Sequence, residues 1–277
     1  MTPYTTLIST DDLAAHLEAS AYLVVDCRFN LEDVGSGRRA YEAAHIPGAV
    51  YAHLNDDLAS ASDGKNGRHP LPDAAAFART LGRFGIGNGT QVIAYDQDAG
   101  MYASRLWWML RWLGHEKAAV LDGGFAKWSA EGRPTASGVE RRLARSFTGV
   151  PRSEMVVSAA DIGAGTLLLD ARAPERFRGD VEPIDHVAGH IPGARNHFYQ
   201  SNLSANGVFR PADELRAQLT RVLGDTSPEG LVCYCGSGVS ACHNLLALEH
   251  AGLHGARLYP GSWSEWSSDP SRPVERP

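Results

Sequence analysis

The chain has 277 residues, of which 43% are apolar, and it carries a formal net charge of −6 at pH 7. This length and composition allow one or two globular domains with substantial cores. The acidic balance disfavours nucleic acid or an anionic membrane as the main partner, so a small-molecule substrate is expected. Residues 1–16 lack the basic and apolar regions of a signal peptide, and no run approaches the ~20 apolar residues of a membrane span. We therefore expect a cytoplasmic protein.

In chain order, short strand-like runs alternate with helical patterns in the first half of the sequence. Leucine-rich and β-branched runs predict strands, and periodic apolar residues between them predict helices. The predicted strands are Tyr22–Asp26, Val50–Ala52, Gln91–Tyr95 and Ala118–Leu121, and the predicted helices are Asp11–Glu18, Ala74–Phe84, Ala103–Leu113 and Ala126–Glu131. This alternation predicts an α/β fold with a parallel sheet flanked by helices.

The segment around residues 136–157 interrupts this alternation. It is polar, rich in arginine and without a sustained period, so we interpret it as the connection between domains. Its arginines could bind an acidic partner, although a solvated linker crossing the surface is the commoner explanation.

Four landmarks recur in the same order across the two halves of the chain. Asp26-Cys27-Arg28 matches Asp170-Ala171-Arg172, and the sequence His-Ile-Pro-Gly-Ala begins at both His45 and His190. The strand before Asp96 matches the strand before Cys235, and Gly124–Trp128 matches Ser262–Trp266. Repeats of this length are duplicated domains. We predict a first domain at 1–135, a linker at 136–157 and a second domain at 158–277.

The second repeat alone places a cysteine where a strand meets a helix. Leu231–Tyr234 reads as a buried strand, and Cys235 is followed by Gly236, Ser237, Gly238, Val239 and Ser240 before an apolar helical run. Such a loop at a helix N-terminus can turn backbone N–H groups toward an anion and favours thiolate over thiol. We therefore predict that Cys235 is the nucleophile and that the N–H groups of Gly236, Gly238, Val239 and Ser240 stabilise it. Ser237 adds a hydroxyl that could move a proton.

The other cysteines are Cys27, Cys233 and Cys242. Together with Cys235 they form neither a disulfide framework nor paired CxxC metal ligands, so we expect no bound metal and no organic cofactor. We interpret these three as small buried hydrophobes.

These motifs together resemble the tandem rhodanese-type sulfurtransferases, and the resemblance covers nearly the whole chain. The sequence Cys235-Gly236-Ser237-Gly238-Val239 is most similar to the loop of the 3-mercaptopyruvate sulfurtransferases; relatives that prefer thiosulfate tend to have Arg and Lys after the cysteine. The resemblance implies two rhodanese-like domains. It also implies that Cys235 takes a sulfane sulfur from a small anionic donor, holds it as a persulfide and passes it to a thiol, thioredoxin or cyanide.

The resemblance also implies residues that bind the donor. Arg176 falls where the family places an arginine facing the active-site cysteine, although it could instead be a surface ion-pair residue with Glu175 or Asp180. A second family arginine has no counterpart at residues 180–186, where Arg178 or His186 could substitute. His69 resembles a histidine near the site; with Ser237 and an acidic residue of Asn55–Asp57 it could form a proton relay, or it could be an ordinary loop histidine.

Other functions fit the loop less well. A phosphatase of Cys-x5-Arg type needs an arginine where this chain has Ala241, and a thiol oxidoreductase needs a resolving cysteine in a CxxC motif. A thiosulfate sulfurtransferase and a non-catalytic sulfur-carrier or regulatory module remain as alternatives to a 3-mercaptopyruvate sulfurtransferase.

Overall fold

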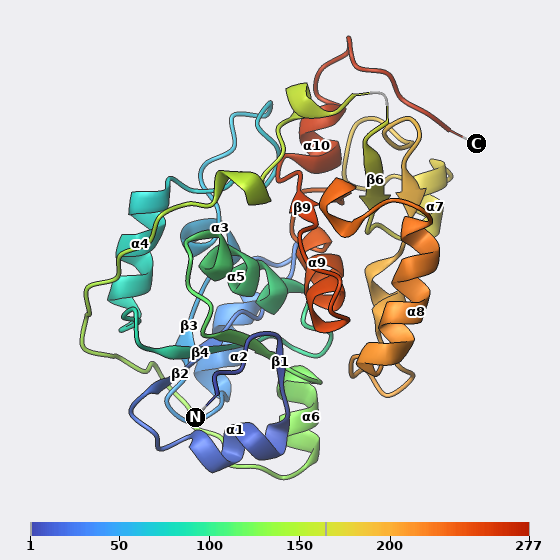
Figure 1. The fold of residues 1–277 in the computed structure, drawn as a ribbon. Coiled ribbons are helices and arrows are strands. Elements are labelled where there is room, and N and C mark those ends of the chain that lie inside the picture. The colour runs from blue at the N-terminus through green and yellow to red at the C-terminus, as the bar shows by residue number, and fades with distance from the viewer. Residues whose placement is uncertain (1, 164, 277) are drawn as a thin grey trace. The chain divides into compact units, whose positions relative to one another are not determined.

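The computed structural model describes residues 2–163 and 165–276, which form two compact units (Figure 1). The first unit comprises Met1–Ser60 and Pro72–Arg152, and the second comprises Ala61–Leu71 and Ser153–Pro277. The short stretch Ala61–Leu71 therefore comes from the first half of the sequence but belongs to the second unit. Within the described ranges, no helix is long and apolar enough to cross a bilayer.

The first unit is a parallel sheet with the strand order β1-β5-β4-β2-β3. Its strands are β1 (Leu7–Ile8), β2 (Tyr22–Asp26), β3 (Val50–Tyr51), β4 (Gln91–Tyr95) and β5 (Ala118–Leu121). Its helices are α1 (Thr10–His16), α2 (Ser36–Ala43), α3 (Leu54–Asp57), α4 (Ala74–Arg83), α5 (Met101–Trp112) and α6 (Gly124–Ala130). The predicted parallel α/β sheet is confirmed. The sequence patterns missed β1, α2 and α3. The elements β1 and α3 have only two and four residues, and α2 buries only Gly37 and Tyr41, so none of them shows a sustained apolar period.

The second unit repeats this plan with the strand order β7-β6-β8-β9, again all parallel. Its strands are β6 (Leu167–Asp170), β7 (Arg195–Asn196), β8 (Leu231–Tyr234) and β9 (Arg257–Leu258). Its α-helices are α7 (Pro174–Arg178), α8 (Ala212–Leu223), α9 (Ala241–His250) and α10 (Ser262–Trp266), and 3-10 turns lie at Ser153–Met155, Ala159–Asp161, Tyr199–Asn202 and Pro228–Gly230. The central strands β4 and β8 occupy equivalent positions, so Asp96 and Cys235 each follow the corresponding strand.

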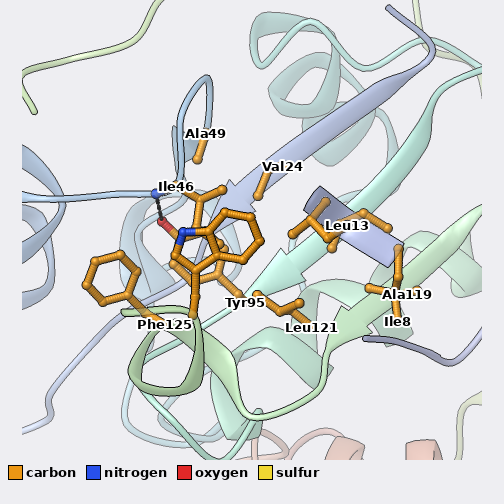
Figure 2. Close-up of a cluster of buried hydrophobic side chains, with 11 residues drawn as sticks. Ile8, Leu13, Val24, Ile46, Ala49, Tyr95, Ala119, Leu121 and Phe125 are labelled. Atoms are coloured by element: carbon orange, nitrogen blue, oxygen red, sulfur yellow. Dashed lines mark hydrogen bonds between the residues drawn. The ribbon is translucent and has the colours of Figure 1, made fainter. Parts of the chain in front are cut away.

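Each unit has its own hydrophobic core, as its length requires. In the first unit, residues from the sheet and the surrounding helices pack into one cluster, part of which Figure 2 shows around Tyr95. In the second unit, Trp263 and Trp266 lie in the equivalent cluster. Trp107, Trp108 and Trp128 are also buried. These tryptophans are therefore core residues.

The repeated Asp-x-Arg motif is structural. In the first unit, the Arg28 guanidinium donates to both carboxylate oxygens of Asp26 at 2.6–3.1 Å and to the Ala44 carbonyl at 2.6 Å. The Tyr95 hydroxyl donates to Asp26 at 2.7 Å and accepts the Ile46 N–H at 3.3 Å, the bond drawn in Figure 2. A buried ion pair is tolerated when such additional hydrogen bonds satisfy its atoms.

The second unit repeats this arrangement. Arg172 donates to both oxygens of Asp170 at 2.7–3.1 Å, and the Tyr234 hydroxyl accepts the Ile191 N–H at 3.3 Å. The two recurring sequence motifs therefore fasten each sheet to the turn that follows His45 or His190.

The arginine-rich segment before the second unit runs along the first unit. Ala136 exchanges backbone hydrogen bonds with His45, and the Arg145 N–H donates to the Gly82 carbonyl at 3.0 Å. At the end of the segment, the Arg152 N–H donates to the Trp112 carbonyl at 2.8 Å. The segment is therefore bound at several points along its length, although its sequence has no helical or strand period.

Candidate active site

Cys235 lies at the carboxyl end of β8, where ligands bind in open α/β sheets. The residue is only 2% exposed. Its Sγ accepts a hydrogen bond from the Gly238 N–H at an N–Sγ distance of 3.1 Å. An oriented N–H donor stabilises negative charge on sulfur, which is the state that a nucleophilic cysteine needs.

The two loop glycines are required for different reasons. Gly238 has a φ of 75°, and a Cβ there would lie 2.5 Å from the Pro260 carbonyl oxygen, so only glycine fits without strain. A Cβ on Gly236 would lie 3.0 Å from Nη2 of Arg68 and 3.7 Å from both terminal nitrogens of Arg176. The missing side chain at Gly236 thus opens the loop toward two guanidinium groups.

Val239 and Ser240 complete the turn into α9. Val239 is buried, and its carbonyl accepts the Cys242 N–H at 3.0 Å. Ser240 is the N-cap residue of α9, and its carbonyl accepts the His243 N–H at 3.1 Å. The loop therefore continues directly into the helix, as its spacing predicted.

Ser237 and His69 are brought together from opposite halves of the sequence. Both side chains are buried, and Nδ1 of His69 lies 2.8 Å from Oγ of Ser237 in a hydrogen bond. The stretch Ala61–Leu71, which carries His69, is part of the second unit. By contrast, Asp56 pairs with His53, and Asp57 pairs with Arg83 and accepts the His53 N–H, all within the first unit.

Arg176, on α7, is held by carboxylates. It donates to both oxygens of Glu182 at 2.6 and 3.2 Å and approaches Asp185 at 3.3 Å. Its partners are therefore Glu182 and Asp185 rather than Glu175 or Asp180. Arg178 donates instead to Asp180 on the surface at 2.8 Å.

Arg68 also lies beside Gly236, although no pattern in the sequence singled it out. Its Nη1 donates to Asp185 at 2.8 Å, and its backbone N–H donates to Ser264 Oγ at 3.0 Å. Asp185 therefore bridges Arg68 and Arg176 beside Gly236. The signal was its position next to His69, but only the packing of residues 61–71 against residues 185 and 264 revealed it.

The carboxylates balance the positive charge of this cluster. Glu182 also accepts from Arg172 at 3.3 Å, so one carboxylate joins two arginines. Burial raises the pKa of Glu182, but hydrogen bonds from Arg176 and from the Asp185 and Ile184 amides outweigh it, and the net shift is downward. Glu182 is therefore ionised in the neutral pH range and fixes the orientation of the guanidinium groups.

Asp96 occupies the equivalent position in the first unit. Its carboxylate accepts the N–H groups of Gly100, Tyr102 and Ala103 at 2.7–3.2 Å. Burial raises the pKa of Asp96, and these three amides act in the opposite direction. The carboxylate itself thus occupies the amide cradle of this repeat.

The chain has three further cysteines. Cys27, Cys233 and Cys242 are buried, and no cysteine of the chain forms a disulfide. Burial raises the pKa values of Cys27 and Cys233 well above the usual thiol range. Neither favours the thiolate form, which a nucleophile requires.

Comparison with known proteins places this geometry in a family. The model of the rhodanese-like domain matches residues 9–131 and again residues 157–269. The chain belongs to the rhodanese family. It is 47% identical over 275 residues to a Pseudomonas aeruginosa protein named "Probable 3-mercaptopyruvate sulfurtransferase", covering 97% of each chain. It is 32% identical to the thiosulfate sulfurtransferase of Cricetulus griseus over 277 residues, covering 95% of this chain and 92% of that protein.

Among solved structures, the 3-mercaptopyruvate sulfurtransferase from Leishmania major has a similar fold. The TM-score is 0.85 at 33% identity, covering 95% of this rhodanese-family chain and 74% of the other. The paired rhodanese-like fold and the sulfurtransferase class predicted from the sequence are confirmed.

Proposed function

We propose that this rhodanese-family protein moves a sulfur atom from 3-mercaptopyruvate to an acceptor through a persulfide on Cys235. The Cys235 thiolate attacks the donor sulfur, and the bond between that sulfur and C3 of the donor breaks. The electron pair of that bond stays on the pyruvate fragment as an enolate, which takes up one proton to give pyruvate. The acceptor thiolate or cyanide then attacks the outer sulfur of the persulfide and releases Cys235.

The hydrogen bond between Ser237 and His69 is the observation from which we propose 3-mercaptopyruvate, and not thiosulfate, as the donor. Cleavage of a carbon–sulfur bond leaves a strongly basic carbon fragment, so the reaction needs a proton donor at the site. Cleavage of thiosulfate releases sulfite, which needs no proton near neutral pH. A buried Ser237–His69 pair therefore supports 3-mercaptopyruvate over thiosulfate.

The remaining residues have supporting roles in this proposal. The Gly238 N–H stabilises charge on Cys235 and its persulfide, while Gly236, Val239 and Ser240 shape the loop that presents it. Arg176 and Arg68 bind the donor carboxylate beside Gly236. Arg68 thus takes the part of the second arginine that is missing from residues 180–186.

We also propose the finer assignments made from the sequence. The catalytic domain is residues 158–277, and residues 136–157 connect the two domains. Residues 1–135 contain no nucleophile, but residues 61–71 contribute side chains to the site. A thiol, such as that of thioredoxin, or cyanide accepts the sulfur. Four cysteines without a disulfide support a reducing, cytoplasmic location.

The test compares wild type, Cys235→Ser and His69→Gln with 3-mercaptopyruvate or thiosulfate as donor. Pyruvate and thiocyanate are followed, and intact-protein mass spectrometry detects the added sulfur atom. Cys235→Ser should lose both the added sulfur and turnover, while Cys27→Ser, which removes a buried cysteine of the first unit, should keep them. Turnover by Cys235→Ser at the wild-type rate would refute the nucleophile.

The His69→Gln variant tests the donor. Loss of a general acid typically costs about 10²- to 10⁴-fold, so turnover with 3-mercaptopyruvate should fall by that order while turnover with thiosulfate changes little. Equal losses with both donors, or a clear preference of wild type for thiosulfate, would refute 3-mercaptopyruvate as the donor.

A further inference from the structure

Ser262, the first residue of α10, has an unusual backbone conformation. Its φ is 54°, and among residues 2–163 and 165–276 it is the only residue other than glycine with a positive φ. The side chain is fully buried. A serine in this region is strained relative to glycine, and such strain persists only where the surrounding structure imposes it.

The Ser262 side chain holds the backbone of the proposed nucleophile. Its Oγ accepts the Cys235 N–H at 3.1 Å and donates to the Tyr259 carbonyl at 2.9 Å. Because Oγ is committed at both ends, its position is fixed. The Cys235 N–H is thereby held by a side chain of α10.

The next two residues of α10 continue this contact. The Trp263 N–H donates to the Cys235 carbonyl and the Ser264 N–H donates to the Gly236 carbonyl, both at 2.9 Å. Across a trans peptide the N–H points opposite to the carbonyl, so the N–H groups of Gly236 and Ser237 are directed away from α10. Three consecutive residues of α10 thus fix how the cysteine loop presents its amides.

The first repeat provides an internal comparison, because Gly124 corresponds to Ser262. Gly124 has nearly the same φ, 58°, and the two residues after it make the same backbone bonds, from Phe125 to Asp96 and from Ala126 to Gln97. Glycine has no hydroxyl, so the side-chain bond exists only in the repeat that carries the thiol. The backbone shape does not require serine, since glycine satisfies it in the first unit without strain.

We propose that Ser262 is a positioning residue for sulfur transfer: its hydroxyl fixes the Cys235 amide and so aims the thiolate at the donor sulfur. This inference rests on the proposed role of Cys235 as nucleophile. Ser262 acts on the geometry of attack rather than on capture of the donor, because the donor carboxylate is assigned to Arg68 and Arg176.

Two substitutions separate the hydroxyl from the backbone strain. Ser262→Gly removes the hydroxyl and relieves the strain, whereas Ser262→Ala removes the hydroxyl and keeps the strain. Ser262→Gly should therefore have the higher melting temperature of the two. If the hydroxyl positions Cys235, both variants should lose kcat with 3-mercaptopyruvate to a similar extent, by about 10- to 100-fold, with KM nearly unchanged.

The control is Ser267→Ala, which removes a hydroxyl that donates to the Trp263 carbonyl at 2.7 Å just after α10. It should retain wild-type kcat. Hydrogen–deuterium exchange of the Cys235 amide gives a readout independent of turnover, and exchange should be faster in both Ser262 variants than in wild type and Ser267→Ala.

Wild-type kcat in Ser262→Gly would overturn the inference, because it would show that only the backbone conformation matters. Unchanged exchange of the Cys235 amide in both variants would also overturn it. Failure of the proposed function is recognised separately, since wild type would then transfer no sulfur to Cys235.

Discussion

Replacing Arg68 by glutamine tests its proposed role in binding the donor carboxylate, a role that the sequence alone did not indicate. Arg68 lies beside Gly236, and its Nη1 donates to Asp185 at 2.8 Å. Glutamine keeps a donor of shorter reach and removes the charge. Because Asp185 also contacts Arg176 at 3.3 Å, its carboxylate keeps a cationic partner in the variant. We therefore expect the second unit to stay folded.

The expected loss follows from the strength of a hydrogen bond to a charged group. Such bonds contribute about 1.5 to 3 kcal/mol, and each 1.36 kcal/mol corresponds to a factor of ten. The value of kcat/KM for 3-mercaptopyruvate should therefore fall by about 10- to 150-fold. A carboxylate remote from the reacting sulfur is held similarly in the ground and transition states, so most of the change should appear in KM.

Arg178→Gln is the matched control for this measurement. Arg178 belongs to the same unit and pairs with Asp180 at 2.8 Å, and both side chains are about half exposed. Steady-state pyruvate formation should be close to wild type in this variant. If Arg68→Gln matched Arg178→Gln in kcat/KM, or lost kcat alone, the assignment of Arg68 to the donor carboxylate would be wrong.

Three further predictions concern the loop and its carboxylates. Asp185→Asn removes a negative charge next to two arginines. The kcat/KM for thiosulfate, divided by that for 3-mercaptopyruvate, should therefore rise about fivefold, which corresponds to about 1 kcal/mol of electrostatic interaction. An unchanged ratio would contradict this. Gly193→Ala should lower the free energy of unfolding in urea by about 1–2 kcal/mol, and Gly238→Ala should lower it by more. Both glycines have φ near 75°, but only at Gly238 does a carbonyl oxygen lie 2.5 Å from the added Cβ. The lowered pKa of Glu182 means that its stabilising effect is complete above the unfolded value near 4.5 and is lost as pH falls through the folded pKa. Urea unfolding between about pH 5 and 3 should therefore depend less on pH in Glu182→Gln than in wild type, and equal slopes would contradict the linkage.

The structure also explains which residues the sequence could identify. Cys235, its loop and α9 are neighbours in the chain, so the spacing of glycines and apolar residues was sufficient to predict them. The Asp-x-Arg and His-Ile-Pro-Gly-Ala motifs were recognised because they recur. In each repeat the first motif forms a buried ion pair, and the isoleucine N–H of the second donates to a tyrosine hydroxyl. Their structural role is visible only in the tertiary structure, because the tyrosine that completes each network comes from another strand.

Only the tertiary structure revealed the contacts of Arg68 and Ser262. The family resemblance suggested that His69 could act with Ser237 but left an ordinary loop histidine open, and the structure brings the two side chains into contact. His69 and Ser237 are separated by 168 residues, and no periodicity relates a loop of the first half of the chain to the cysteine loop. The sequence also does not predict the positive φ of Ser262, because serine rarely adopts this conformation. Its only indication in the sequence is that Ser262 matches Gly124 of the first repeat. Local spacing thus predicted Cys235 as the nucleophile, and it determined the repeat and the fold class, since these depend on residues close in the chain or repeated along it. The proposed roles of Arg68 and of the His69–Ser237 pair, and the hydrogen bond that Ser262 makes to the Cys235 amide, depend on long-range packing, which brings together residues that no local pattern connects.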